Sequence, residues 1–560
     1  MASRTMASRT YADAVAALNT LQSNFAIVDA IRKSGKKMNE QSIPEMIGWA
    51  RKLGYQVCNA NADGADGADL DACVSLPLPA VTSREPPPSD FNSLQAIHIA
   101  GTKGKGSTAA YVASILSQFA NNGDGPGPSK IGLYTSPHLR FVRERIQING
   151  SPLSEDQFAA YFFETWDRLG MDRTSASASA SAVQQPKLTY FRFLTLMALH
   201  AYKRENCDAA VIECGIGGEY DSTNIIQRPS VTAITSLGID HVAVLGDTLG
   251  EIAWHKAGIM KAGARCYTPS SQRDEAKAVL DRVAAERGVE LVYVPVTREL
   301  TTPSQRDSPP LLQADFQRTN ASLAIAIAED FLRQKGIVRP DRSLILRGIQ
   351  SARWPGRCDV RPEPENSITW CLDGGHTLDS IQVAGQWFAS RRKTATTAAR
   401  SYLIFNQQTR DAASLARALA ASAQSQNANP GHHPSRPFDT VIFCTNTTYK
   451  DSGFKPDHVS INTNKAEVDQ LKVQKELAQV WAELDPSADV RVVKTIEEAI
   501  QLVRLLSGEQ QAKEGEGEGE ESTVLITGSL HLVGGALEVL EAEAERGEKS
   551  RSQVDEIAWR

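Results

Sequence analysis

The sequence predicts an α/β protein built from two domains. Short apolar segments that suit buried strands alternate with segments of helical periodicity, and this alternation predicts parallel sheets covered by helices on both faces. The strand candidates are residues 96–100, 130–135, 208–214, 231–238, 368–374, 401–406, 439–445, 489–495 and 522–529. A Pro-Gly turn in RWPGR, at 353–357, separates a helical stretch from the fifth of these strands. We therefore predict a first domain at 1–360 and a second α/β domain at 361–560.

Helical patterning marks three further stretches, at 11–55, 321–332 and 343–351. Segments rich in Gly, Pro, Ser or Glu interrupt the alternation, and their composition buries too little apolar surface to order them. We expect these segments to be surface insertions near 59–90, 121–129, 172–186, 300–312, 422–437 and 508–521.

The composition favours a soluble protein. The chain has 560 residues, of which 41% are hydrophobic, and its net charge of −6 comes from 60 basic and 66 acidic residues. This balance argues against a nucleic-acid surface, and no apolar run reaches the ~20 residues of a membrane span. Eight cysteines without a CxxC pair suggest reduced thiols in an intracellular protein. We expect a cytoplasmic monomer; Arg4 and Arg9, with no acid before Asp13, would also suit the edge of a mitochondrial presequence.

A glycine-rich loop joins a strand to a helix in the stretch LQAIHIAGTKGKGSTAAYVASILSQF, at 94–119. Gly101, Gly104 and Gly106 follow the strand, and apolar residues at three- and four-residue spacing then predict the helix. Glycines let backbone N–H groups face an anion, and the start of the helix adds a partial positive charge. The loop therefore predicts a phosphate site.

Side chains of the same loop would complete such a site. Either Lys103 or Lys105 supplies a full positive charge, and the hydroxyl of Ser107 or Thr108 could reach a metal that accompanies the phosphates. The strict pattern GxxxxGK[ST] is not met, because an isoleucine replaces its first glycine and a glycine separates the lysine from the serine. A flexible basic turn is the alternative interpretation.

Polar residues also follow three of the predicted strands. Ser136 follows the second strand, Glu213 ends the third and His241 follows the fourth. Ligands of open α/β sheets sit at the carboxyl ends of the strands, and a buried acid is costly unless it is paired or bound to a cation. These side chains could converge on one Mg²⁺, although imidazole suits softer metals. Simple turns are the alternative.

The remaining candidates are more ambiguous. Asp221, Thr223 and Asn224 offer polar contacts after the glycines that follow the third strand, whereas Lys256, on a helix among small residues, suggests a surface lysine by default.

In the second half, Asp373 and His376 follow the strand at 368–374, where we expect them to face a cleft between the domains. The guanidinium of Arg357 would either reach phosphates or form a salt bridge in the hinge.

Ten motifs, in order along the chain, resemble the folylpolyglutamate synthase family of Mur-type amide ligases, in its eukaryotic form. They are HIAGTKGKGST, YTSPHLRFVRERIQING, TYFRFLTLMAL, ECGIGGEYDSTNII, SLGIDHVAVLGDT, EIAWHKAGIMK, QRTNASLA, WPGRCDV, LDGGHT and TGSLHLVGG. The resemblance covers nearly all of 11–545 apart from the insertions. It implies an N-terminal P-loop domain that binds ATP and folate, and a smaller Rossmann-like C-terminal domain that serves glutamate ligation.

The reaction implied by the resemblance adds L-glutamate to the γ-carboxylate of tetrahydrofolate and its polyglutamates. ATP phosphorylates this carboxylate to an acyl phosphate, and the amine of glutamate then displaces phosphate. Mg²⁺ accompanies ATP, and a second cation is implied near a carbamylated lysine. The implied partners are therefore small molecules, namely ATP, a reduced folate and L-glutamate.

The resemblance also assigns site residues, motif by motif. They are the phosphate contacts Gly104, Lys105, Gly106 and Ser107, the further ATP contacts Asn320, Arg357 and Asp373, the magnesium ligands Ser136, Glu213 and His241, and the pterin contacts Tyr220, Asp221 and Ser222. Lys256 matches the family's carbamylated lysine, and His376 matches a histidine near the incoming glutamate. With Lys105, these two are the implied catalytic residues.

Two other functions remain open. Dihydrofolate synthase uses the same machinery to join the first glutamate to dihydropteroate, and a bifunctional enzyme would do both. A nucleotide-binding regulatory protein without ligase chemistry would also keep the phosphate loop, although the acid and histidine set argues against it. Gly375, where the family commonly has alanine, is a minor departure.

Overall fold

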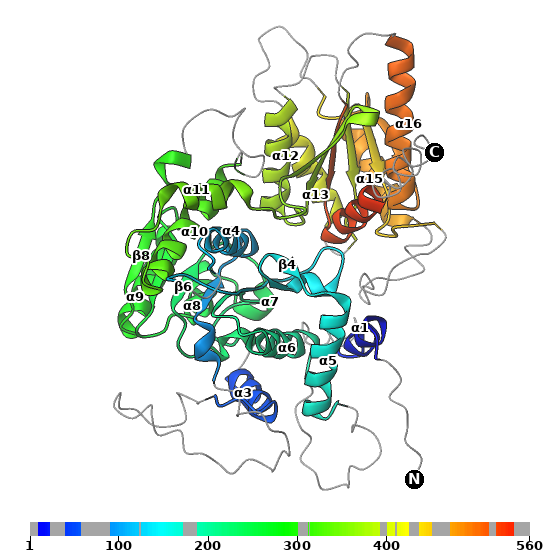
Figure 1. Ribbon diagram of the computed structural model, residues 1–560. Coiled ribbons are helices and arrows are strands. Elements are labelled where there is room, and N and C mark those ends of the chain that lie inside the picture. Colours follow the sequence, from blue (N-terminus) through cyan, green and yellow to red (C-terminus); the bar gives the residue numbers. More distant parts are fainter. Residues whose placement is uncertain are drawn as a thin grey trace, which may run out of the picture. The chain divides into compact units, whose positions relative to one another are not determined.

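The computed structural model describes residues 9–22, 40–57, 90–121, 125–171, 188–300, 312, 314–392, 400–408, 411–424, 436–450, 471–514 and 522–542. The chain divides into two compact units, each built around its own sheet (Figure 1). Unit 1 comprises Met1–His138, Arg143–Pro303 and Phe316–Arg353. Unit 2 comprises Leu139–Val142, Ser304–Asp315 and Trp354–Arg560.

The sheet of unit 1 has eight strands in the order β4-β3-β2-β5-β1-β6-β7-β8. They are β1 (Ala96–Ala100), β2 (Ile131–Tyr134), β3 (Ile146–Ile148), β4 (Ser151–Pro152), β5 (Ala209–Glu213), β6 (Val231–Ile234), β7 (Arg265–Pro269) and β8 (Leu291–Val294). Neighbours are parallel except for the β2–β3 and β3–β4 pairs. The central strands β2, β5, β1 and β6 are buried along their whole length and coincide with the four predicted for this unit.

Helices cover this sheet. They are α1 (Tyr11–Asn19), α3 (Ser42–Lys52), α4 (Lys105–Ser117), α5 (Glu155–Leu169), α6 (Tyr190–Arg204), α7 (Val242–Leu245), α8 (Leu249–Ala257), α9 (Asp274–Glu286), α10 (Asp315–Gln334) and α11 (Arg342–Ser351). Reciprocal capping boxes start α1, α5 and α8, at Thr10, Ser154 and Thr248. Helix α4 packs against β1, β2 and β5, and α11 packs against α4. The helices predicted at 321–332 and 343–351 are thus present as α10 and α11.

The sheet of unit 2 has six strands in the order β13-β12-β11-β14-β10-β9, with only β9 antiparallel to its neighbour. They are β9 (Asp359–Glu363), β10 (Ile368–Asp373), β11 (Ser401–Phe405), β12 (Thr440–Phe443), β13 (Asp489–Val492) and β14 (Ser522–Thr527). Its helices are α12 (Leu378–Arg392), α13 (Ala412–Ala423), α15 (Lys472–Leu484), α16 (Ile496–Glu514) and the helical residues 530–542.

Both faces of the second sheet are covered, as the alternation of strands and helices predicts. On one face Ile404, Ile442 and Ile526 pack with α16 and with residues 532–539. Successive side chains of a strand point to opposite faces. Accordingly Phe443, next to Ile442, contacts Trp481 of α15, with ring centroids 6.3 Å apart. The prediction of an α/β fold with helices on both sides of mainly parallel sheets is confirmed.

Five strands were not predicted, and they lie toward the edges of the two sheets. Strand β8 is half-buried along its length, β7 begins with the exposed Arg265, and β4 is two exposed residues long. Strands β3 and β9 are also largely half-buried. Strands of this kind lack the continuous apolar run by which a fully buried strand is recognised.

The predicted insertions fall mainly on residues that the structure leaves undescribed. One prediction was wrong in part, because 508–514, assigned to an insertion, continue helix α16 to Glu514. The Glu, Gln, Ala and Lys residues of this stretch have high helix propensity, which the low-complexity reading overlooked. The six cysteines within the described ranges are buried free thiols, whereas Cys58 and Cys73 lie outside those ranges. None of the described helices has the length and apolar character needed to cross a membrane.

Candidate active site

The candidate site lies at the carboxyl ends of the four central strands of unit 1. Strands β2, β5, β1 and β6 are adjacent and parallel, so the segments that follow them emerge at one edge of the sheet. Ser136 follows β2, Glu213 ends β5, the glycine-rich loop follows β1, and His241 follows β6. The predicted site residues of this unit are thus brought to one edge.

Helix α4 begins directly at the glycine-rich loop. Its N-cap is Gly104, with φ 90°, and no side chain caps the helix. The backbone N–H groups of Thr102 and Lys103 both donate to the carbonyl of Ser236, at 3.1 Å. Helix α4 starts at Lys105, so the backbone N–H groups of its first turn have no helical carbonyl one turn earlier to bond. These N–H groups are therefore available to an anion.

Residues of helix α10 contact the glycine-rich loop and the first turn of α4. A Cβ atom on Gly104 would lie 2.2 Å from Oδ1 of Asn320, so only glycine fits there. Asn320 is buried and donates to Gln317 at 3.2 Å, and Gln317 in turn reaches the hydroxyl of Ser107 at 3.4 Å. Gly106 and Ser107 both lie in the first turn of α4. Gln317 was not singled out in the sequence, although its three-residue spacing from Asn320 on a helix was a usable signal.

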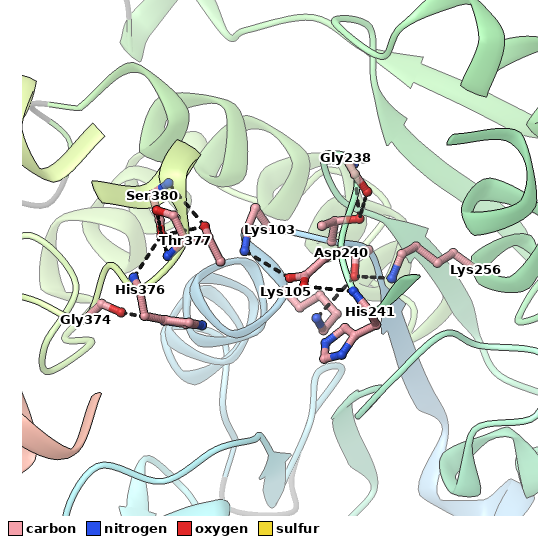
Figure 2. A network of polar contacts seen from close by, with 12 residues as sticks. Lys103, Lys105, Gly238, Asp240, His241, Lys256, Gly374, His376, Thr377 and Ser380 are labelled. Carbon is pink, nitrogen blue, oxygen red and sulfur yellow. Dashed lines mark hydrogen bonds and ion pairs between the residues drawn. The ribbon is translucent and has the colours of Figure 1, made fainter. Parts of the chain in front are cut away.

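Two lysine side chains share one carbonyl oxygen. Nζ of Lys256 donates to the oxygen of Gly101 at 2.8 Å, and Nζ of Lys105 donates to the same oxygen at 3.2 Å. Lys103 instead forms an ion pair with Asp240, at 3.1 Å (Figure 2). Because Asp240 compensates the charge of Lys103, the geometry favours Lys105 as the lysine available to a phosphate.

The interpretation of Lys256 as a surface lysine was wrong. Only 3% of the residue is exposed, because α8 turns this side chain inward, where its ammonium donates to the carbonyl of Gly101. Burial, reinforced by the charge of Lys105, lowers the pKa of Lys256 to about 7. A large fraction of this amine is therefore uncharged near neutral pH.

Ser136 and Glu213 form the oxygen-rich part of the site. The backbone N–H of Ser136 donates to the carboxylate of Glu213 at 2.9 Å, and Glu213 is only 4% exposed. A carboxylate beside a hydroxyl suits a hard cation such as Mg²⁺, which keeps several waters and takes few protein ligands. Among the described residues, no group of three or more His, Cys, Asp or Glu side chains that could hold a metal is found.

His241 stands in a left-handed backbone conformation, with φ 53°, and its N–H donates to Asp240 at 2.9 Å. His241 is exposed as a whole residue, but partial desolvation of its imidazole lowers its pKa; nearby Lys256, Lys105 and Lys103 add to the effect, while Asp240 opposes it. For Asp240 burial acts to raise the pKa, but Lys103 and His241 outweigh it and bring the pKa to about 2. A neutral imidazole beside an ionised carboxylate is the form that can coordinate a metal.

The predicted pterin contacts follow Glu213 on a tight turn. Asp221 is buried, and its carboxylate accepts hydrogen bonds from the N–H groups of Ile216 and Thr223, each at 2.9 Å. Burial raises the pKa of Asp221, and these hydrogen bonds act to lower it. Ser222 is also buried, whereas Tyr220 is half-exposed, with its ring 6.2 Å from that of Trp254. Tyr220 is thus the more accessible contact.

Unit 2 gathers the predicted residues of its own segment around β10. Asp373 accepts hydrogen bonds from the N–H groups of Cys358 and Gly375, each at 2.9 Å. Its burial raises the pKa of Asp373, and Arg357 opposes the shift. Nδ1 of His376 lies 2.8 Å from the carbonyl of Gly374, as Figure 2 shows.

Comparison with known proteins places the chain in a family. No family model matches the sequence. The folylpolyglutamate synthase of Saccharomyces cerevisiae is 39% identical over 548 residues, covering 96% of this chain and 88% of the yeast protein.

Solved structures show the same fold. Folylpolyglutamate synthase of Mycobacterium tuberculosis, complexed with ADP and AMPPCP, has a TM-score of 0.61 at 21% identity and covers 94% of this chain and 98% of its own. FolC of E. coli, in complex with DHPP and ADP, has a TM-score of 0.59 at 20% identity and covers 96% and 99%. Since the yeast relative matches nearly the whole chain at this level of identity, the protein belongs to the folylpolyglutamate synthase family.

Proposed function

We propose that this protein is an ATP-dependent ligase that adds L-glutamate to the γ-carboxylate of tetrahydrofolate and of its polyglutamates. The observation that carries the proposal is the uncapped start of α4, with Lys105 beside it and the Ser136–Glu213 pair at the end of neighbouring strands. Family membership supplies the reaction class, and relatives of the same fold are complexed with ADP or AMPPCP.

The first step would transfer the terminal phosphoryl group of ATP to the γ-carboxylate. A carboxylate is a poor electrophile, so phosphorylation supplies the leaving group that amide formation needs. The N–H groups at the start of α4 and the ammonium of Lys105 would orient the phosphates and offset their charge. The amine of L-glutamate would then attack the acyl carbon, and phosphate would leave with the bonding electrons.

Three residues would hold Mg²⁺, namely Ser136, Glu213 and His241. When bound, the ion would offset negative charge on the phosphates of ATP. Glu213 and Ser136 are within one hydrogen bond of each other, which supports a shared role.

Lys256 would carry a carbamate that helps to hold a second cation. Carbamylation joins CO₂ to the uncharged amine with release of a proton, and a pKa of about 7 makes the uncharged form abundant. The reaction would also replace a buried positive charge beside Lys105 by a negative one, relieving the repulsion that depresses this pKa.

The other assignments follow the resemblance. Asn320, Arg357 and Asp373 would complete the ATP contacts, His376 would lie near the incoming L-glutamate, and Tyr220, Asp221 and Ser222 would contact the pterin. Residues 1–360 would then serve ATP and folate, and 361–560 glutamate ligation. We further propose a monomer in the cytoplasm with a mitochondrial pool, which ultracentrifugation and cell fractionation would test.

One assay tests the reaction and the substrate class together. Purified protein is given ATP, Mg²⁺ and L-glutamate with either tetrahydrofolate or dihydropteroate, and phosphate release and product mass are measured. We expect glutamylated tetrahydrofolate and stoichiometric phosphate. Product from dihydropteroate alone would instead identify a dihydrofolate synthase, and ATP binding without glutamate-dependent phosphate release would identify a regulatory protein.

A further inference from the structure

A buried polar chain connects the strand before the phosphate loop to the turn that carries the proposed pterin contacts. His98, in the middle of β1, is 0% exposed, and its Nε2 lies 2.8 Å from the hydroxyl of Thr223. That hydroxyl donates to the carboxylate of Asp221 at 2.6 Å. We call His98, Thr223 and Asp221 the relay; the reaction described above uses none of the side-chain contacts that link them.

In the relay, the groups that can only accept determine which atom donates each hydrogen bond. The carboxylate of Asp221 receives donors from Ile216 N, Thr223 N and Thr223 Oγ1, so the hydroxyl proton of Thr223 points to it. The oxygen of Thr223 is then left to accept, and a protonated Nε2 of His98 can donate to it; Sγ of Cys214 lies 3.1 Å from the same nitrogen. Burial and the charge of Lys261 lower the pKa of His98 to about 3, which keeps the imidazole neutral with one proton to place.

Each end of the relay is fixed to a different part of the site. His98 lies three residues before Gly101, whose carbonyl oxygen receives both Lys105 and Lys256. At the other end, the carboxylate of Asp221 binds the turn at two backbone N–H groups. The relay therefore ties the turn at 214–224 to the strand that leads into the phosphate loop.

We propose that the relay is a positioning device that holds the turn at 214–224 in the conformation that binds the folate acceptor, with little influence on ATP. This inference rests on the proposed function. The asymmetry follows from the geometry, because β1 is held by β5 and β6 on either side, whereas the turn, which the structure describes in full, has only two short backbone bonds of its own, Asp221 N to Gly218 O and Asn224 N to Asp221 O, and the carboxylate of Asp221 adds three more.

The central link is the one to break. Thr223→Val keeps the shape of the side chain but removes the hydroxyl, so Nε2 of His98 keeps only its contact with Sγ of Cys214, at 3.1 Å, and the buried carboxylate of Asp221 loses one of its donors. We expect the KM for tetrahydrofolate to rise by about tenfold, the factor that corresponds to ~1.4 kcal/mol, with the KM for ATP changed by less than about twofold. Thr223→Ser restores the hydroxyl and should restore the KM for folate.

A matched control separates positioning from general destabilisation. Thr232→Val, on β6, removes another buried hydroxyl, which donates to the carbonyl of Arg265 at 3.1 Å. It should lower the melting temperature without moving the KM for folate. If Thr223→Val does the same, or raises both KM values equally, the positioning role is overturned.

A second pair of variants, at His98, tests the same relay if Thr223→Val does not fold. His98→Gln can place a donor near the position of Nε2, whereas His98→Leu cannot, so the folate KM should rise for the leucine variant only. Hydrogen exchange of the ligand-free protein provides a readout that does not depend on the reaction. Faster exchange at 214–224 with unchanged exchange at 105–108 supports the relay even if the wild-type protein fails the glutamylation assay, and unchanged exchange at 214–224 would overturn it.

Discussion

Gly101 contributes no side chain, yet its carbonyl oxygen is the point where two cationic side chains meet. The ammonium groups of Lys105 and Lys256 both donate to this one acceptor, at 3.2 and 2.8 Å. Two positive charges at this separation repel each other, and this repulsion is part of the reason why the pKa of Lys256 falls to about 7. The site is therefore poised to receive negative charge.

Lys105→Ala should remove the charge that we propose for binding the terminal phosphate of ATP. We expect kcat to fall by about 100-fold or more, as for loss of one transition-state donor, with the melting temperature little changed. Lys103→Ala is the matched comparison, and its loss should be smaller because Lys103 is paired with Asp240. Steady-state kinetics of both variants decide between the two lysines, and equal losses would contradict the assignment.

The buried amine of Lys256 predicts a pH dependence of stability. Its folded-state pKa, about 7, lies below the ordinary 10.5, so the unfolded chain binds more protons between these values. The free energy of unfolding should therefore gain up to about 1.4 kcal/mol per pH unit above pH 7 from this group.

Lys256→Met should lose that gain, as urea unfolding at pH 7 and pH 9 in carbonate-free buffer would measure. Lys277→Met, on the surface of α9, controls for the loss of one positive charge. A wild-type protein and a Lys256→Met variant with the same pH slope would show that Lys256 is not held in the buried state.

Gly104→Ala should disable the phosphate loop by steric conflict. The added Cβ would lie 2.2 Å from Oδ1 of Asn320, at a φ of 90° that L-residues rarely adopt. Gly263→Ala has nearly the same strain, with φ 85°, but open space around it. We expect the first variant to lose ATP binding, measured by calorimetry, and the second to lose about 1 kcal/mol of stability only.

Among single residues, the sequence could predict those whose burial would cost free energy without a partner. Glu213 could be predicted because a carboxylate at the end of a buried strand needs a partner, and the structure supplies one in the N–H of Ser136. The burial of Lys256 could not be predicted from its residues alone, because nothing in AWHKAGIMK reveals which face of the helix is buried. The link between His98 and Thr223 spans 125 residues, so no local pattern encodes it.

Helix α4, which begins at the phosphate loop, depends on a close approach to α11. A Cβ atom on Gly348 of α11 would lie 2.6 Å from the Cα of Ile115, and the hydroxyl of Ser114 donates to the carbonyl of Gly348 at 2.7 Å. The two helices thus meet backbone to backbone, which only a glycine allows.

Gly348→Ala should therefore destabilise the protein by about 1–3 kcal/mol, as overpacking does. Gly48→Ala, in the exposed face of α3, meets no atom within 4 Å and should stabilise by about 0.5–1 kcal/mol through helix propensity. Chemical denaturation measures both. Opposite signs are expected for the same substitution, and a stabilising Gly348→Ala would contradict the close packing.

The difference between central and edge positions in a sheet explains which strands could be predicted. Central strands such as β1 and β5 are continuous apolar runs, so their positions follow from the sequence within one or two residues. Edge strands such as β8 and β9 are half-exposed and carry no such run. Their pairing is decided by the neighbouring strand, which a local pattern does not contain.

Unit 2 includes a short segment from the first third of the sequence. Leu139 packs against the core formed by β10, β11, β14, α16 and residues 532–539, and a Cβ on Gly356 would lie 3.0 Å from its Cδ1 atom. The ion pair of Arg140 with Glu541 lies in the same unit. Four residues, Leu139–Val142, are thus embedded in a unit otherwise formed largely by the last third of the chain.

Leu139→Ala should loosen unit 2 although the substitution lies far from it in sequence. We expect faster hydrogen exchange at 532–537 and near Gly356, with exchange of β1 and β5 unchanged, because the lost packing belongs to the core of unit 2. Leu133→Ala, on β2 of unit 1, is the comparison and should affect β5 instead. Faster exchange at β5 in the Leu139 variant would contradict the division of the chain.

The placement of residues 139–142 in unit 2 has a consequence for synthesis on the ribosome. Residues 139–142 are translated more than two hundred residues before Trp354, where the main part of their own unit begins. Until that part has been made, Leu139 has no core to enter, while the sheet of unit 1 also awaits its last helices. Nascent chains halted before the C-terminal third should therefore expose this leucine to chaperones, and the two units would be completed late and nearly together.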